Sequence, residues 1–152
     1  MFLATLLMLV PVGAVACGTP SGGDPGGRRL RELSGDPVFA ARPPGVARVV
    51  LTRAPARHRE PGFDAGGWHG PAVRLTFRSD APPAAVYRFY ARRAKAAGWR
   101  ARKSGALGLA DTWTKTYPDG ADATLLLSLL ARHPDGPTRL YTLAGGVAPV
   151  AR

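Results

Sequence analysis

The side chains with the chemistry of metal ligands gather mostly in one stretch of the chain. His58, Glu60, Asp64 and His69 fall within the glycine- and proline-rich segment 54–71, and His133 stands far downstream. Imidazole nitrogens and carboxylate oxygens bind zinc when a regular spacing brings them together. Here the spacing follows no regular ligand pattern, and neither HExxH nor His-x-His occurs. The sequence therefore predicts solvated loop residues, no metal and no cofactor.

The hydroxyl nucleophiles show no catalytic pattern either. The serines are Ser21, Ser34, Ser79, Ser104 and Ser128. None of them stands in a G-x-S-x-G elbow, and no phosphate-binding loop or dinucleotide fingerprint is present. A hydrolase that joins a serine to His69 or His133 and an acid is the least favoured interpretation, and the sequence does not favour an enzyme.

The only cysteine, Cys17, follows an uncharged apolar run from Phe2 to Ala16. A helix that spans a bilayer needs about 20 apolar residues, and Pro11 and Gly13 weaken this shorter run as a helix. Its length suits the hydrophobic region of a secretory signal that ends in small residues. An ordinary secretory signal, and an uncleaved or buried apolar segment, stay open as alternatives.

The residues Ala14-Val15-Ala16-Cys17 resemble the lipobox of bacterial lipoproteins. The resemblance implies cleavage of a signal peptide (residues 1–16), diacylation of the Cys17 sulfur with fatty acids such as palmitate, and acylation of the new amino group. It implies an extracytoplasmic protein, lipid-anchored on the outer face of the cell membrane. Membrane lipid is then a partner through Cys17.

The stretch that follows Cys17 is poor in residues that a core can bury. Gly, Ser and Pro dominate Gly18 to Gly27, and Arg28 to Gly45 adds three prolines without a helix or strand pattern. Such composition is typical of flexible linkers. We predict an irregular Gly/Pro/Arg tether over 17–45, followed by one domain over 46–148.

The chain has 18 Arg and 3 Lys against 10 acidic residues, a net charge of +11. A basic surface attracts polyanions. For an exported protein these are anionic lipids or wall polymers, and the leading segment disfavours nucleic acid. Arginine in place of lysine is also typical of high-GC bacterial genomes, so the charge names no protein partner.

Alternation of apolar and polar residues predicts strands over 46–53, 72–78, 112–117, 121–131 and 138–144. In 72–78, Val73, Leu75 and Phe77 fall on one face, and Arg74 and Arg78 on the other. The strand 121–131 is expected to be covered on part of both faces, because it is leucine-rich on both. The strand 138–144 is expected to close the sheet, and 54–71 to be a long loop.

One helix is predicted over 82–98, with Pro83 at its first turn and Gly98 at its end. The order β-β-α-β-β-β predicts an α+β fold in which one helix packs on a mostly antiparallel sheet. The string VYRFYARRAKAAGWR, with the later Trp-bearing strand, PDG turn and leucine-rich strand, resembles small α+β domains of uncharacterised lipoproteins from high-GC Gram-positive bacteria. This resemblance covers about residues 73–144 and implies fold and setting, without catalytic residues.

The candidate binding surface joins the sheet face away from the helix to the 54–71 loop. The candidate ligand-binding residues are Trp68, His69, Arg74, Arg78 and Thr114. Long loops in compact domains are often either functional or disordered, and Trp68 is better explained as a side chain that folds back to anchor the loop. We predict a non-catalytic interaction or accessory module. The alternative is a module that binds a small molecule or lipid at this surface.

Overall fold

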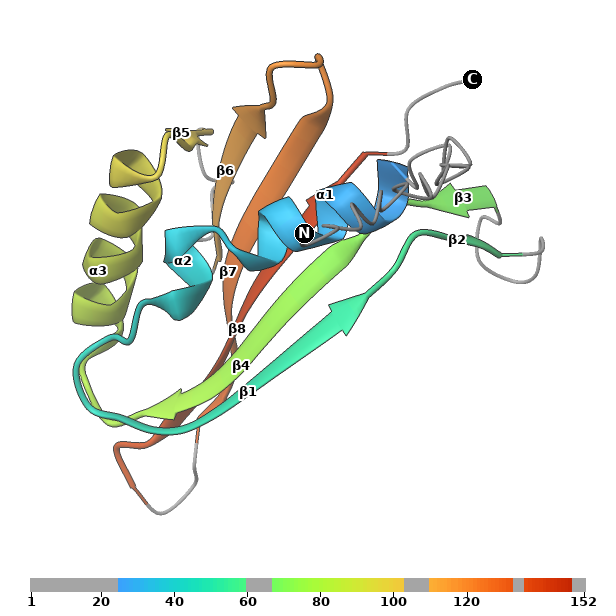
Figure 1. Cartoon of the computed structure of the whole chain (residues 1–152). Coiled ribbons are helices and arrows are strands. Elements are labelled where there is room, and N and C mark those ends of the chain that lie inside the picture. Colours follow the sequence, from blue (N-terminus) through green and yellow to red (C-terminus); the bar gives the residue numbers. More distant parts are fainter. Residues whose placement is uncertain (1–24, 60–66, 103–109, 133–135, 149–152) are drawn as a thin grey trace, which may run out of the picture.

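The computed structural model describes residues 25–59, 67–102, 110–132 and 136–148. A six-stranded antiparallel sheet of order β1-β4-β8-β7-β6-β5 forms its centre, and the three helices of this part of the chain lie against one face (Figure 1). The strands are β1 (Val46–Ala54), β4 (Ala72–Ser79), β5 (Arg100–Ala101), β6 (Ala110–Thr116), β7 (Asp122–Arg132) and β8 (Arg139–Val147), and the helices are α1 (Pro25–Ser34), α2 (Pro37–Ala40) and α3 (Pro83–Ala96). The predicted α+β fold, with a helix packed on an antiparallel sheet, is confirmed.

Strand β4 shows how the alternating sequence sets the two faces of the sheet. Val73, Leu75 and Phe77 are buried, whereas Arg74 and Arg78 are exposed, as predicted. Strand β8 pairs with β4 on one side and with β7 on the other. The prediction that this last strand closes the sheet is therefore wrong, because the edges are β1 and β5.

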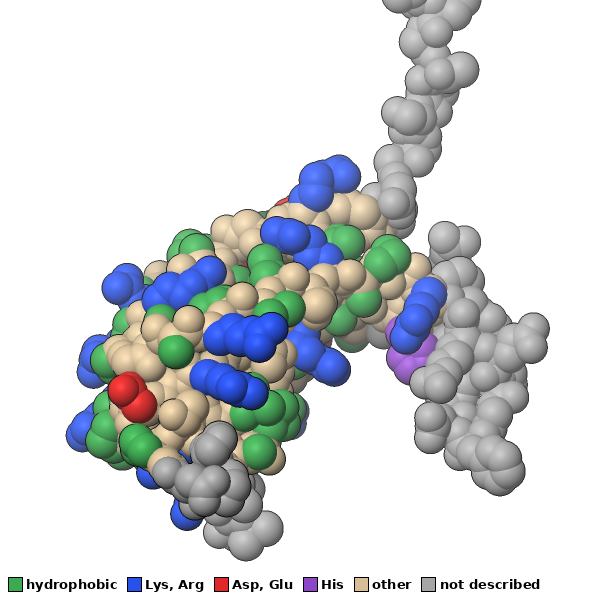
Figure 2. All heavy atoms as spheres, turned by 90° about the horizontal axis from the view of Figure 1, so that it is seen from below, with side chains coloured by type: hydrophobic (Ala, Val, Ile, Leu, Met, Phe, Trp, Pro, Cys, Tyr) green, Lys and Arg blue, Asp and Glu red, His purple; other side chains and the backbone are tan. Residues whose placement is uncertain are grey.

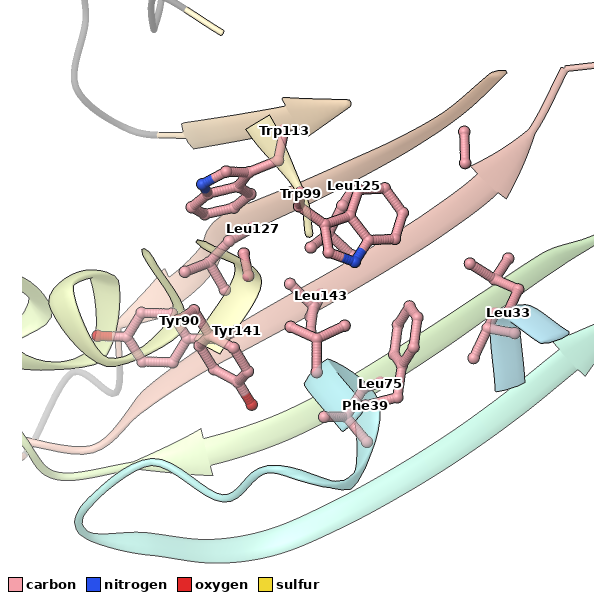
Figure 3. Close-up of a cluster of buried hydrophobic side chains, with 14 of the residues drawn as sticks. Leu33, Phe39, Leu75, Tyr90, Trp99, Trp113, Leu125, Leu127, Tyr141 and Leu143 are labelled. Carbon is pink, nitrogen blue, oxygen red and sulfur yellow. The ribbon is translucent and has the colours of Figure 1, made fainter. Parts of the chain in front are cut away.

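The predicted helix is α3, and its apolar side packs on the core face of the sheet. Val86, Tyr90 and Ala94 are buried. The ring of Tyr90 lies 5.6 Å from that of Phe77, and Figure 3 shows Tyr90 and Tyr141 in one cluster with both labelled tryptophans. Gly98 has a φ of +83°, which a glycine adopts at little cost at the end of a helix.

The segment 28–45, predicted to be irregular, is mostly helical, and that prediction is wrong. Helix α1 begins at Pro25, and Leu33, Val38 and Phe39 are almost fully buried in the core. One helix about 10 Å wide covers only part of a sheet whose strands are about 4.8 Å apart. The first two helices cover the part that α3 leaves open, so residues 25–45 belong to the domain.

Gly145 in β8 lets these helices approach the sheet. A Cβ atom built there would lie 2.7 Å from Phe39 Cζ and 3.3 Å from Leu33 Cδ1. Real Cβ atoms essentially never come as close to a carbon as the first of these contacts. Because Gly145 has no side chain, the Phe39 ring occupies the space that a Cβ atom would need.

Two further predictions are corrected by the structure. The 54–71 loop contains a two-stranded antiparallel sheet, β2 (Arg57–Arg59) paired with β3 (Gly67–His69). Within the described ranges strand β7 is covered on one face only, since the helices there all lie on the core side and Leu126 and Leu130 are exposed. Leucines on both faces of a strand therefore do not imply a second covering layer in this protein.

Candidate functional site

One face of the sheet carries no helix from the described part of the chain; we call it the open face, and the strand register defines its members. On β1 and β4 its members are Arg48, Val50, Thr52, Arg74, Thr76 and Arg78. On β8 and β7 they are Leu140, Thr142, Ala144, Gly146, Thr124, Leu126 and Ser128, and on β6 they are Thr112, Thr114 and Thr116. Small residues occupy its middle, arginines its β1–β4 side and threonines its β6 side. The open face is thus a broad, shallow surface with chemically different sides.

Exposed large apolar side chains also belong to this side of the sheet. Val50 is 47% exposed and Leu126 37%, and the register places both on the open face, whereas Leu130, 55% exposed, lies at a bulge in β7. Scattered apolar residues are normal on protein surfaces, but groups of them mark interaction sites. Here Val50 and Leu126 share one face with the arginines.

The open-face arginines have no counter-charge. The side chains of Arg48, Arg74 and Arg78 make no hydrogen bond or ion pair with any residue in the described ranges. Figure 2, which views the molecule from below, shows Lys and Arg side chains predominating over acidic ones on the side in view. An anion that approaches there meets guanidinium groups whose hydrogen-bond donors are free.

Two of these arginines flank a shallow depression in the open face. Arg48 in β1 is the direct register partner of Arg78 in β4. The depression has a volume of about 190 Å³, and its lining residues are Arg48, Val50, Thr76, Phe77, Arg78 and Leu140. It combines two cationic walls with a largely apolar floor.

The structure separates the predicted site residues into groups. Arg74 and Arg78 lie on β4, whereas Thr114 lies on β6, with β8 and β7 between them. Three strand spacings amount to roughly 14 Å, so one small ligand does not contact Thr114 and the arginines together. These three residues share a face without forming one site.

The remaining predicted residues lie away from the open face. Exposed His69 belongs to the separate β2–β3 sheet, where it pairs with Arg57, and Trp68 pairs with His58 beside it. Cys17, Ser104 and His133 lie outside the described residues. Trp68 and His69 therefore belong to a different sheet from Arg74 and Arg78.

A polar cluster on the core side, missed by sequence reasoning, joins the N-terminal helices to the sheet. The Asp36 carboxylate accepts hydrogen bonds from Trp99 Nε1 at 3.1 Å, Lys115 Nζ at 2.9 Å and the Val38 amide at 3.1 Å. Lys115 also donates to the carbonyl of Ala97. Because every partner comes from the chain itself, this cluster is a structural fastening.

Arg29 extends this cluster toward the β6–β7 turn. It forms ion pairs with Glu32 and Asp119, and its guanidinium lies 4.4 Å from the centre of the Tyr117 ring. Burial raises the pKa of Tyr117 above its usual value, and the nearby carboxylates of Asp36 and Glu32 act in the same direction. The phenol therefore stays neutral at physiological pH.

Metal ligation and membrane crossing find no support in the described ranges. No group of three or more His, Cys, Asp and Glu side chains there is placed to hold a metal ion. None of the helices in those ranges has the length and apolar character that crossing a membrane requires. The open face remains the surface with the clearest binding chemistry.

Sequence reasoning found Arg74 and Arg78 but not Arg48, Val50 or Leu140. The alternation of VARVVLTR already places Arg48 and Val50 on one face of β1. Their position opposite Arg78 depends on the β1–β4 register. Leu140 enters the site because β8 pairs with β4 in the middle of the sheet.

Comparison with known proteins gives no match: no family model fits the chain, and no curated protein or solved structure is significantly similar to it.

Proposed function

We propose that this protein is an extracytoplasmic lipoprotein, held on the outer face of the cell membrane by acylated Cys17, that acts as a non-catalytic binding module. The open face is its binding surface. The observation that carries this proposal is the absence of any covering layer on that face within the described ranges, where exposed apolar side chains and unpaired arginines lie together.

Charge restricts the partner that such a surface accepts. Three unpaired guanidinium groups repel a basic partner and favour an acidic one, which also speeds encounter. The apolar side chains of Val50 and Leu126 supply contact area that a purely ionic surface lacks. We therefore assign the open face to an anionic partner with apolar character.

The anchor and the fold together determine how far the domain stands from the bilayer. Helix α1 starts at Pro25, roughly eight residues after Cys17. Even a fully extended chain of that length spans at most about 29 Å. An acylated Cys17 therefore keeps the domain beside the membrane, where each basic residue near an anionic surface contributes about 1 kcal/mol.

Membrane fractionation tests the anchor. Globomycin, which blocks lipoprotein signal cleavage, is expected to cause accumulation of the unprocessed chain, and Cys17→Ala is expected to move the protein out of the membrane fraction. Ser21→Ala, four residues away, is the matched control and should remain membrane-bound. Equal membrane association of all variants, with and without globomycin, would refute the lipid anchor.

Position-specific photo-crosslinking in cells tests the binding surface. A photoreactive residue at Leu126 on the open face is expected to give a discrete adduct. The same residue at Arg92, exposed on α3, is the control for the opposite layer. Adducts from Arg92 alone, or equal adducts from both positions, would contradict the assignment of the open face.

A small-molecule ligand is the second candidate, and the depression between Arg48 and Arg78 favours it. Binding of a ligand only to the folded state raises the melting temperature in proportion to its affinity and concentration. Calorimetry is the suitable readout, because Trp99 and Trp113 are buried on the core side and report poorly on the open face.

A further inference from the structure

Arg48 and Arg78 form an unusual pair in the sheet. They stand directly opposite each other on neighbouring antiparallel strands. Like charges in this position destabilise a sheet, because the side chains project side by side. Neither residue has a carboxylate partner in the described part of the chain. An anion between the two guanidinium groups would convert this repulsion into attraction.

The depression between them limits the size of that anion. Its volume of about 190 Å³ is below the roughly 300–1,000 Å³ of pockets that enclose drug-sized ligands. A head group with a short apolar substituent fits this limit. Val50 and Leu140 supply the apolar contact, and Thr76 adds a hydroxyl at the floor.

The number of guanidinium groups favours phosphate over carboxylate. Each arginine presents a planar fork that binds two oxygens at once. A carboxylate has two oxygens and satisfies one fork. The three terminal oxygens of a phosphate monoester serve two forks that approach from opposite sides.

We propose that the Arg48–Arg78 depression is a binding site for a phosphate ester that carries a short apolar group. The phosphate lies between the two guanidinium groups, and the apolar group lies on Val50 and Leu140. This proposal rests on the proposed function in placing the ligand on the open face, but it does not require that Cys17 be acylated. A lipid head group and a soluble phosphate ester share this chemistry.

Titration calorimetry on the full chain in nonionic detergent tests the site. The probes are inorganic phosphate, hexyl phosphate, hexanoate and dihexanoyl phosphatidate, all at the same ionic strength. Hexyl phosphate is expected to bind more tightly than inorganic phosphate and hexanoate. Tighter binding of the phosphatidate identifies a lipid as the source of the ligand, and tighter binding of hexyl phosphate identifies a soluble ester.

Single-residue variants show which side chains contribute to the affinity for hexyl phosphate. Arg48→Gln and Arg78→Gln are each expected to weaken hexyl phosphate binding about ten- to a hundred-fold, as loss of a hydrogen bond to a charged group implies. Arg48→Lys should weaken it less. Arg74→Gln is the matched control, because it removes the same charge from the same face outside the depression, and it should change affinity less than threefold.

Amide chemical shifts of each variant, recorded first without ligand, establish that the fold is retained. Equal weakening by Arg74→Gln and Arg78→Gln, or the absence of hexyl phosphate binding, would overturn the site. Shift changes that cluster around Leu126 and Thr124 instead would overturn this site but support the open face as a binding surface. An absence of shift changes on the whole open face with every probe would count against both.

Discussion

The carboxylate of Asp36, at the start of α2, lies 2.9 Å from the ammonium group of Lys115 on β6. The side chain of Asp36 is only 2% exposed. The pair connects residues that are 79 positions apart, and the indole of Trp99 shares the same carboxylate. The N-terminal helices are thus fastened to the sheet by a buried charge as well as by apolar contacts.

Loss of this carboxylate should destabilise the fold strongly. Asp36→Ala leaves the Lys115 ammonium and the Trp99 N–H without their acceptor, and breaking a buried pair from one side costs about 3–5 kcal/mol. The cost should lie near the lower limit, since Lys115 is partly exposed. Urea unfolding followed by far-ultraviolet circular dichroism measures the change.

Asp122→Ala is the control for this experiment. Asp122 is exposed and accepts a hydrogen bond from Thr116 in the described ranges, so its removal should cost less than about 1 kcal/mol. Equal decreases in the free energy of unfolding for Asp36→Ala and Asp122→Ala would show that the buried pair contributes no more than an exposed hydrogen bond.

The close contact at Gly145 leads to a second prediction. Gly145→Ala forces Phe39 or the β8 backbone to move, and overpacking of this kind costs about 1–3 kcal/mol. Gly146→Ala is the matched control, because its Cβ would meet only the carbonyl of Pro71 at 4.0 Å. Thermal unfolding of both variants gives the comparison.

A double variant separates steric overlap from backbone effects. Phe39→Leu removes the ring that a Cβ at position 145 would meet, so the cost of Gly145→Ala should fall when Phe39→Leu is already present. Neighbouring residues are coupled in this way, whereas distant ones are additive. Additive costs would mean that the glycine is needed for another reason.

The sequence predicts the central part of this fold because local pattern and burial agree there. The alternation in β4 suffices to orient that strand. The apolar stripe of α3, in which Val86 and Tyr90 stand four residues apart, suffices to orient that helix. Both were predicted with the correct faces. Their packing then follows from the need to bury them.

The N-terminal helices could not be predicted because their composition resembles a linker. Helix α1 begins with Pro25, Gly26 and Gly27, a composition typical of a linker. Its few apolar residues include Leu30 and Leu33. That helix is explained by a tertiary requirement, namely the uncovered half of the sheet. Because the domain begins with α1 at Pro25, the connection from Cys17 to the domain is short.

Only part of the candidate site could be predicted from the sequence. Alternation places Arg74 and Arg78 on the outer face, which the structure confirms. The pairing of Arg48 with Arg78 depends on register, and the distance from Arg78 to Thr114 depends on strand order. Neither quantity can be read from local pattern in a sheet whose last strand lies in its middle.

The tyrosines predict how stability depends on alkaline pH. Burial raises the pKa of all four, Tyr87, Tyr90, Tyr117 and Tyr141, above the ordinary value of 10.0. The unfolded chain then releases these protons first as pH rises, so the contribution of the tyrosines to stability is constant below about pH 10 and falls above it. Urea unfolding between pH 8 and pH 11 measures the slope.

Tyr141→Phe should reduce that slope and leave neutral stability unchanged or slightly higher. The Tyr141 hydroxyl is buried and has no hydrogen-bond partner among the described residues, and removal of an unsatisfied group costs little. Tyr87→Phe is the control, since it loses a hydrogen bond with the backbone of Leu129. An unchanged alkaline slope in Tyr141→Phe would contradict the assigned shift.

The lipid anchor at Cys17 is tested most sharply by the intact mass of the full chain isolated from bacterial membranes. If Cys17 is the anchor, the mass equals that of a polypeptide beginning at Cys17 plus a diacylglyceryl group, with or without one further acyl chain. Cys17→Ala should show neither the cleavage before position 17 nor the lipid. An unmodified mass for the wild-type protein, or the same added mass in Cys17→Ala, would rule out acylation of Cys17.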